Sequence, residues 1–210
     1  AIQEMGYESP MPVQEEVIPF LLGDDNDVIA LAQTGTGKTA AFGLPILQKI
    51  DVTTYHPQAL VLCPTRELCL QIADDLNDYS KYIDNLKVLP VYGGSSIESQ
   101  IKTLKRGVHV VVATPGRLLD LMNRKTVDLS LVKNVIMDEA DEMLNMGFTD
   151  SINAILAEVP ENRNMLLFSA TMPKEIANIT KKYMKNPKEI VIGNKNEGNK
   201  NIRDIYYMVQ

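Results

Sequence analysis

Eight consecutive residues, Ala32 to Thr39, have the composition of a loop that holds a phosphate chain. Glycines let the backbone approach phosphate oxygens closely, and the consecutive N–H groups of such a loop point into one concavity. Lys38 adds a full positive charge for the outer phosphates, and the Thr39 hydroxyl suits the Mg²⁺ ion that accompanies them. We therefore expect a nucleotide-binding loop whose members are Gln33, Thr34, Gly35, Thr36, Gly37, Lys38 and Thr39.

The residues on either side of this loop are those that phosphate binding requires. Upstream, residues 27–31 are a short apolar run with β-branched side chains, which is typical of a buried parallel strand. Downstream, residues 40–44 have the composition of a helix. The common form of the motif begins with glycine, but the methyl group of Ala32 is small enough to be accommodated. The strand, loop and helix together distinguish this motif from a chance Gly/Thr loop that carries a lysine.

A pair of carboxylates follows another apolar run, residues 135–137. A carboxylate at the end of a neighbouring buried strand can hold Mg²⁺, directly or through water, and Asp138 is the candidate. Glu139, the next residue, could orient and deprotonate an attacking water. Acidic residues also favour helix N-termini, but the phosphate loop earlier in the chain favours the catalytic interpretation.

The composition of the 210-residue chain is that of an ordinary globular domain, with 45% apolar residues. No apolar run approaches the roughly 20 residues that span a bilayer, and the first residues lack a signal pattern, so we expect a soluble, cytoplasmic protein. Cys63 and Cys69 lack the spacing of a metal site and are interpreted as core thiols. The net charge of −6 on its own argues against binding to nucleic acid. It does not exclude such binding, because phosphate contacts need only a local basic face.

Short apolar runs alternate with amphipathic segments along the chain. We expect strands at residues 28–31, 59–63, 88–92, 109–113, 134–137, 165–168 and 189–192. We expect helices at residues 66–83, 97–105, 118–124, 150–158 and 174–184. This alternation predicts a mainly parallel sheet covered by helices on both faces, with ligands at the carboxyl ends of the strands. Residues 193–201 are polar and are expected to form a loop, and 202–210 resume a strand-like pattern.

The tetrapeptide Asp138-Glu139-Ala140-Asp141 resembles the signature of the DEAD-box RNA helicases, and the phosphate loop, with its alanine start, is similar to theirs. Further matches run in the family's order: Gly6-Tyr7, Pro10, Pro12 and Gln14; residues 64–68; Gly93-Gly94; residues 114–117; and residues 169–171. The resemblance covers essentially the whole chain but only the first of the family's two RecA-like domains. It implies an α/β, RecA-like P-loop NTPase domain over residues 1–201, with 202–210 as a linker toward a second domain.

The resemblance also implies roles for residues near the N-terminus, with ATP and Mg²⁺ as ligands. Gln14 resembles the family's adenine reader, and its amide offers the donor and the acceptor that the adenine N6/N7 edge requires. Tyr7 is grouped with it as a nucleotide contact. Without the other motifs, Gln14 would be an ordinary first-turn helix residue. The family usually has Thr or Ser in place of Met11, so a helix cap is lost, and its adenine-stacking aromatic residue would lie upstream of Ala1.

Five residues resemble the family's contacts to the RNA sugar-phosphate backbone: Thr65, Arg66, Gly94, Thr114 and Arg117. Arginine forks and hydroxyl groups that bind phosphates do not read base identity, so we expect sequence-independent binding to single-stranded or locally opened RNA. The same residues also suit helix starts, with Thr65 and Thr114 as caps.

Two further residues, Ser169 and Thr171, resemble those that link hydrolysis to strand separation. We expect them to form hydrogen bonds with residues 138–141, and we group them with Lys38, Asp138 and Glu139 as catalytic residues. Alternatively, a Ser and a Thr at a strand end could cap the helix that begins at Lys174. The sequence does not separate these interpretations.

The resemblance implies an ATP-dependent RNA helicase whose hydrolysis and unwinding need the second domain, which carries the family's catalytic arginines. An ATP-locked RNA clamp would share these motifs, and strand-displacement assays distinguish the two. A DNA helicase or another phosphate-loop ATPase is disfavoured by the Gln14 region and the spelling of residues 138–141. Residues 194–197 are close to the guanine-reading motif of GTP-binding proteins, but the decisive carboxylate is Glu197 and not Asp, and the flanks are polar.

Overall fold

The computed structural model describes residues 1–23, 27–33 and 35–192. Thr34 of the phosphate loop lies outside these residues. So do the predicted loop at 193–201, with the motif resembling that of GTP-binding proteins, and the predicted linker at 202–210. Within the described ranges, no helix is long and apolar enough to cross a bilayer.

A seven-stranded parallel sheet lies at the centre of the molecule, in the strand order β3-β4-β2-β5-β6-β1-β7. The strands are β1 (Val28–Leu31), β2 (Ala59–Leu62), β3 (Val88–Val91), β4 (Val110–Ala113), β5 (Asn134–Met137), β6 (Asn164–Ser169) and β7 (Lys188–Val191). Each lies within one residue of its predicted bounds. The predicted parallel sheet is therefore confirmed, and all of its carboxyl ends lie along one edge.

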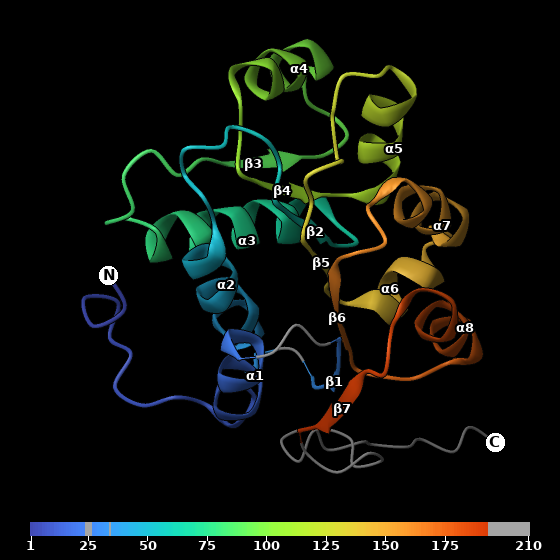
Figure 1. Ribbon diagram of the computed structural model, residues 1–210. Helices are drawn as coiled ribbons and strands as arrows, with labels where there is room; N and C mark the ends of the chain where they lie inside the picture. The colour runs from blue at the N-terminus through green and yellow to red at the C-terminus, as the bar shows by residue number, and fades with distance from the viewer. Residues whose placement is uncertain (24–26, 34, 193–210) are drawn as a thin grey trace, which may run out of the picture.

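Helices cover both faces of the sheet (Figure 1). One face carries α1 (Pro12–Leu22), α2 (Lys38–Lys49) and α3 (Arg66–Tyr79). The other face carries α4 (Ile97–Arg106), α5 (Pro115–Asn123), α6 (Ala140–Asn145), α7 (Thr149–Glu158) and α8 (Lys174–Tyr183). This arrangement confirms the predicted α/β architecture.

Alternating strand residues feed two hydrophobic cores. In β1, Val28 and Ala30 point toward the core under α1, α2 and α3, whereas Ile29 and Leu31 point toward the core under the other helices. This alternation follows from the two-residue side-chain period of a strand. Burying each large apolar side chain stabilises the fold by about 1.5–3 kcal/mol, so the sheet is a firm frame for the loops at its ends.

Helix bounds differ from the predicted ones in ways that have local causes. The predicted helix over 66–83 ends at Tyr79, and residues 80–86 continue as turns with Asn85 at a φ of 65°. Ile83 still packs against the core from this turn. Its apolar side chain therefore fits the spacing of a longer helix in the sequence, although the helix has already ended. The predicted helix over 118–124 instead begins at Pro115, because a proline at the first helical position is already preset for the helix.

Candidate functional site

Three adjacent strands bring the predicted nucleotide-binding residues together. The phosphate loop follows β1, Asp138 follows β5, and Ser169 ends β6, and β6 pairs with both other strands. At the start of the loop, Ala32 N–H donates to the Ser169 carbonyl at 3.0 Å. The sheet therefore places the loop and the carboxylates at one point of its carboxyl edge.

The phosphate loop depends on two glycines with left-handed backbone conformations. Gly35 has a φ of 77° and Gly37 a φ of 81°, where residues with side chains are strained. A Cβ on Gly37 would lie 2.5 Å from Gln14 Nε2. After this turn, α2 begins at Lys38, so the loop meets a helix N-terminus with its partial positive charge.

Lys38 and Asp138 form a buried ion pair. The Lys38 Nζ lies 3.1 Å from Asp138 Oδ1, and the two side chains are 8% and 4% exposed. The same Oδ1 accepts a hydrogen bond from Glu139 N–H at 3.0 Å. The cation expected to contact phosphate and the carboxylate expected to hold Mg²⁺ thus neutralise each other.

The Glu139 carboxyl has the electrostatic setting of a general base. Burial raises its pKa above the ordinary value, and the nearby Asp138 carboxylate raises it further, while Lys38 acts in the opposite direction. A raised carboxyl pKa improves proton acceptance near neutral pH. The residue also has a left-handed backbone, with a φ of 52° at the start of α6, which is uncommon for a non-glycine residue.

The Thr39 hydroxyl forms a hydrogen bond with the Asp75 carboxyl of α3. Burial raises the pKa of Asp75 above its ordinary value, and the hydrogen bond with Thr39 acts in the opposite direction. No group of three or more His, Cys, Asp or Glu side chains that could hold a metal occurs among the described residues.

The hydrogen bonds predicted for Ser169 and Thr171 are confirmed for one residue only. Thr171 donates from its backbone N–H and its Oγ1 to Asp141 Oδ2, at 3.0 and 2.8 Å. For Ser169 the prediction is wrong, because its buried Oγ has no hydrogen-bond partner among the described residues. The alternative, capping of α8, is also wrong, since the N-cap residue is Pro173 and no side chain caps the helix.

Gln14 contacts the phosphate loop directly. Its Nε2 donates to the Gly37 carbonyl at 3.2 Å, and its Oε1 accepts from Met11 N–H at 2.9 Å. Met11 is the N-cap of α1 and provides no side-chain cap hydrogen bond, as its replacement of a hydroxyl residue predicts. Tyr7 lies elsewhere, with its hydroxyl 2.9 Å from that of Tyr79 at the end of α3.

The five predicted RNA-contact residues gather in the other half of the same edge, where β3, β4 and β2 are neighbours. The Arg66 guanidinium lies 5.0 Å from the centre of the Tyr92 ring, which is a cation–π distance. A Cβ on Gly94 would lie 3.6 Å from Arg66 Nη1. The loop after β3 and the start of α3 therefore meet.

The two predicted threonine caps behave differently. Thr65 Oγ1 accepts a hydrogen bond from Leu68 N–H at 3.2 Å and caps α3. Thr114 occupies the N-cap position of α5 without a side-chain cap hydrogen bond, so that part of the prediction is wrong. Arg117, in the first turn of α5, donates from Nη1 to the Ser95 carbonyl and to Gln100 Oε1.

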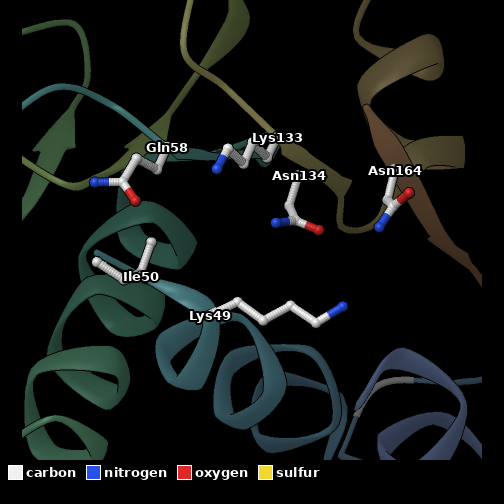
Figure 2. Close-up of a pocket in the computed structure, with 6 residues that line it drawn as sticks. All are labelled: Lys49, Ile50, Gln58, Lys133, Asn134 and Asn164. Carbon is white, nitrogen blue, oxygen red and sulfur yellow. The ribbon is translucent and has the colours of Figure 1, made fainter. Parts of the chain in front are cut away.

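Sequence reasoning missed three residues that support this half: Tyr92, Ser95 and Gln100. The available signal was the inward position of a polar residue in the amphipathic α4. A separate polar pocket lies near the amino ends of β2, β5 and β6, with a volume of about 240 Å³ (Figure 2). Its lining is Lys49, Ile50, Gln58, Lys133, Asn134 and Asn164, none of which is a predicted site residue.

Comparison with known proteins gives consistent matches. The DEAD/DEAH box helicase family model matches residues 11–179. A Mycobacterium tuberculosis protein named ATP-dependent RNA helicase DeaD is 51% identical over 209 residues, which are 100% of this chain and 37% of that protein. The Escherichia coli K12 protein of the same name is 49% identical over 192 residues, 91% of this chain and 30% of that protein. The chain thus spans about a third of these relatives.

Solved structures agree with these matches. A DEAD box protein from the hyperthermophile Methanococcus jannaschii has a TM-score of 0.86 and 46% identity, covering 90% of this chain and 52% of that chain. A hypothetical ATP-dependent RNA helicase from Sulfolobus tokodaii has a TM-score of 0.83 and 44% identity, covering 91% of this chain and 55% of that chain. The fold is the α/β, RecA-like fold, and the chain belongs to the DEAD/DEAH box helicase family.

Proposed function

We propose that this chain is the nucleotide-binding, N-terminal RecA-like domain of an ATP-dependent RNA helicase. It binds ATP with Mg²⁺ in one half of its carboxyl edge and the RNA sugar-phosphate backbone in the other half. The observation that carries the proposal is this juxtaposition on one rigid sheet: Lys38 and Asp138 meet after β1 and β5, while Arg66 and Arg117 lie after β2 and β4.

The residues present fit Mg-ATP. Gly35 leaves open space where a Cβ would stand, so phosphate oxygens can approach the backbone. Lys38 would exchange Asp138 for the outer phosphates, and this exchange would release the carboxylate toward the metal together with Thr39. Mg²⁺, when bound, neutralises charge on the phosphates. Gln14 would turn its amide from Met11 toward the adenine edge.

For hydrolysis, Glu139 is the proposed base that holds and deprotonates the attacking water. Burial raises the pKa of its carboxyl, which suits proton acceptance at neutral pH. Asp141 and Thr171 would transmit changes at this site toward the loop after β6, because they already share two hydrogen bonds. Ser169 Oγ, which is buried and has no hydrogen-bond partner among the described residues, would join them when a donor or acceptor reaches it.

Hydrolysis by this chain alone is expected to be slow. Phosphoryl transfer is driven by positioning and charge stabilisation, and an arginine at the transferring phosphate contributes roughly 10³- to 10⁵-fold in rate. Among the described residues, the contacts of Arg66, Arg117, Arg124 and Arg163 are with groups away from the phosphate loop, and Arg106 is the last residue of α4. A further domain of a longer protein would provide the missing cation.

RNA is the proposed partner of the β3-β4-β2 half. Its arginines, hydroxyls and the exposed Gly94 backbone offer donors to phosphates and sugars, and these contacts position a strand without reading its bases. Local positive groups suffice despite the negative net charge of the chain. Cys63 and Cys69 are free, buried thiols, which supports a cytoplasmic location.

ATP turnover tests the proposal. The chain should bind ATP tightly in the presence of Mg²⁺, yet hydrolyse it near the background rate with or without saturating single-stranded RNA. A matched DNA oligonucleotide should bind more weakly than the RNA. RNA-stimulated turnover of about 1–100 per second, abolished by Glu139→Gln, would mean that the chain contains the complete catalytic site and would contradict the need for a further domain.

A further inference from the structure

Gln100 is an unusual residue for its position in α4. It is the one buried residue of this helix, at 6% exposure, whereas the apolar Ile97, Ile101 and Leu104 are only partly buried. Burying an amide is unfavourable unless its hydrogen bonds are satisfied. The side chain therefore occupies its place because of specific partners.

The partners of Gln100 all belong to the RNA-facing half. Its Nε2 donates to the Tyr92 carbonyl at 3.2 Å and to Ser95 Oγ at 2.7 Å. Its Oε1 accepts from Arg117 Nη1 at 3.0 Å. One buried amide thus joins the loop after β3 to the helix that follows β4.

These contacts fix how the Arg117 guanidinium is presented. Nη1 carries two hydrogens, and it donates to the Ser95 carbonyl at 3.1 Å as well as to Gln100. Nη1 is therefore fully used by the protein. The Nε and Nη2 donors form the opposite edge of the planar group and have no hydrogen-bond partner within the described part of the chain, although the Glu98 carboxylate attracts the guanidinium through space. That edge has the spacing of a bidentate phosphate contact.

The same amide reaches the other predicted RNA contacts through Tyr92. Its carbonyl is bonded to Gln100, while its ring lies under the Arg66 guanidinium at 5.0 Å. Gly94, with a φ of 82°, lies within the loop between Tyr92 and Ser95. Movement of this loop would therefore displace Arg66, Gly94 and Arg117 together.

We propose that Gln100 is the positioning residue of the RNA-binding half, and that its buried amide holds Arg117 and the Tyr92–Ser95 loop in the geometry that binds consecutive phosphates of one strand. Gln100 does not touch RNA. It acts by removing the conformational freedom that these groups would otherwise lose on binding. This inference rests on the proposed RNA-binding function and adds Gln100 to it as a residue that supports the RNA contacts without being one of them.

The test compares binding of the 210-residue chain to a fluorescent single-stranded RNA over a range of NaCl concentrations. Gln100→Ala should weaken binding about three- to tenfold, the cost of ordering one or two side chains again at each binding event. The slope of log affinity against log salt should stay nearly unchanged in Gln100→Ala, because the Arg117 charge still reaches its phosphate, whereas Arg117→Ala should lower the slope by about 0.7, the value for one lost phosphate contact on a single strand. If Gln100 acts through Arg117, Gln100→Ala should weaken binding less in the Arg117→Ala background than in the unmodified chain.

Gln58→Ala is the matched control. Gln58 is also a buried glutamine, at 5% exposure, and its amide makes three hydrogen bonds to Asp51 and Thr54 at the pocket of Figure 2. Its substitution should lower the melting temperature about as much as Gln100→Ala does and leave RNA affinity and salt slope unchanged. If Gln58→Ala weakens RNA binding equally, the effect is general destabilisation and the inference is wrong.

A second variant keeps the inference testable if Gln100→Ala does not fold. Gln100→Glu preserves the shape but places a carboxylate against Arg117, so RNA affinity should fall and recover as the pH is lowered and the carboxyl is protonated. Wild-type affinity of Gln100→Glu at pH 7.5 would overturn the inference. An effect of Arg117→Ala without any effect of the Gln100 variants would do the same, whereas no effect of Arg117→Ala would contradict the proposed RNA contact itself.

Discussion

The two halves of the carboxyl edge hold their functional groups in different ways. In the β5-β6-β1 half, the key side chains are buried and bond to other groups of the same half. Examples are the Lys38–Asp138 ion pair and the hydrogen bond from Gln14 to the Gly37 carbonyl. In the β3-β4-β2 half, Arg66 and Arg117 are at least partly exposed and are held by neutral groups, a tyrosine ring, a carbonyl and an amide.

This difference implies different responses to ligands. The charge of a buried cation is partly neutralised by the carboxylate with which it is paired, so we expect nucleotide binding to rearrange the first half. An arginine held by neutral acceptors keeps its full charge for a phosphate, so the second half is preorganised. Preorganisation lowers the entropic cost of binding. We expect the paired half to be more selective, because its ligand has to provide new partners for both Lys38 and Asp138.

The largest expected effect comes from separating the two charges of the nucleotide half. Lys38→Ala should weaken ADP binding about 10- to 100-fold, since contacts with charged groups contribute about 1.5–3 kcal/mol. Asp138→Asn should retain binding without Mg²⁺ and lose most of the Mg²⁺-dependent gain, because we propose that this carboxylate holds the metal. Calorimetry with and without Mg²⁺ measures both, with the exposed Lys181→Ala as a control. Identical behaviour of the two variants would contradict the assigned roles.

The next effect concerns the preorganised half. Arg66→Ala and Arg117→Ala should each weaken single-stranded RNA binding by about tenfold or less, similarly for unrelated sequences, with a smaller salt slope. Fluorescence anisotropy with several oligonucleotides measures this, and Arg124→Ala, an exposed arginine paired with Asp120, is the control. A strong preference for one sequence, or no effect of either change, would refute backbone binding.

Gln14, which contacts the phosphate loop and is the proposed adenine reader, should produce a smaller change. We expect the chain to prefer ADP over GDP, and Gln14→Ala to remove most of that preference, because one lost polar contact costs on the order of 1 kcal/mol. Competition titration with both nucleotides measures the ratio. Equal affinities in the unmodified chain would show that Gln14 does not read the base.

The smallest effect concerns stability in the absence of ligands. Because the pKa of Glu139 is raised in the folded protein, the unfolded chain releases this proton at a lower pH, and stability falls as the pH rises from the ordinary carboxyl value through the folded pKa. Glu139→Gln removes this loss. Its melting temperature should exceed that of the unmodified chain at pH 7.5, and the difference should shrink below about pH 4. A lower melting temperature at pH 7.5 would contradict the burial of this charge.

The comparison also explains which features could be predicted from the sequence. The seven strands and the meeting of Lys38 with Asp138 follow from apolar runs and from the rule that parallel strands end at one edge. The partners of each polar group did not follow, because they depend on side chains brought together across several elements. Gln100 reaches Arg117 only through the packing of α4 and α5.

Ser169 is a second residue whose hydrogen bonding could not be predicted from the sequence. Its sequence context suggested a hydrogen bond to the acidic segment, but in the free protein Thr171 alone makes that contact and the Ser169 hydroxyl remains without a partner in the described structure. A buried unpaired hydroxyl costs about 1–3 kcal/mol. No local pattern in the sequence shows which of these two neighbouring hydroxyl residues pairs with the acidic segment.

The central claim is that Lys38 and Asp138 form a strongly coupled buried ion pair, and a double-mutant cycle measures that coupling. Urea unfolding of the nucleotide-free chain, Lys38→Ala, Asp138→Asn and the double variant gives the coupling free energy of the buried pair. The matched cycle on the exposed pair Arg124–Asp120 should give about 0.3–0.5 kcal/mol. We predict about 1–3 kcal/mol for Lys38 and Asp138, and additivity within about 0.5 kcal/mol would contradict the account.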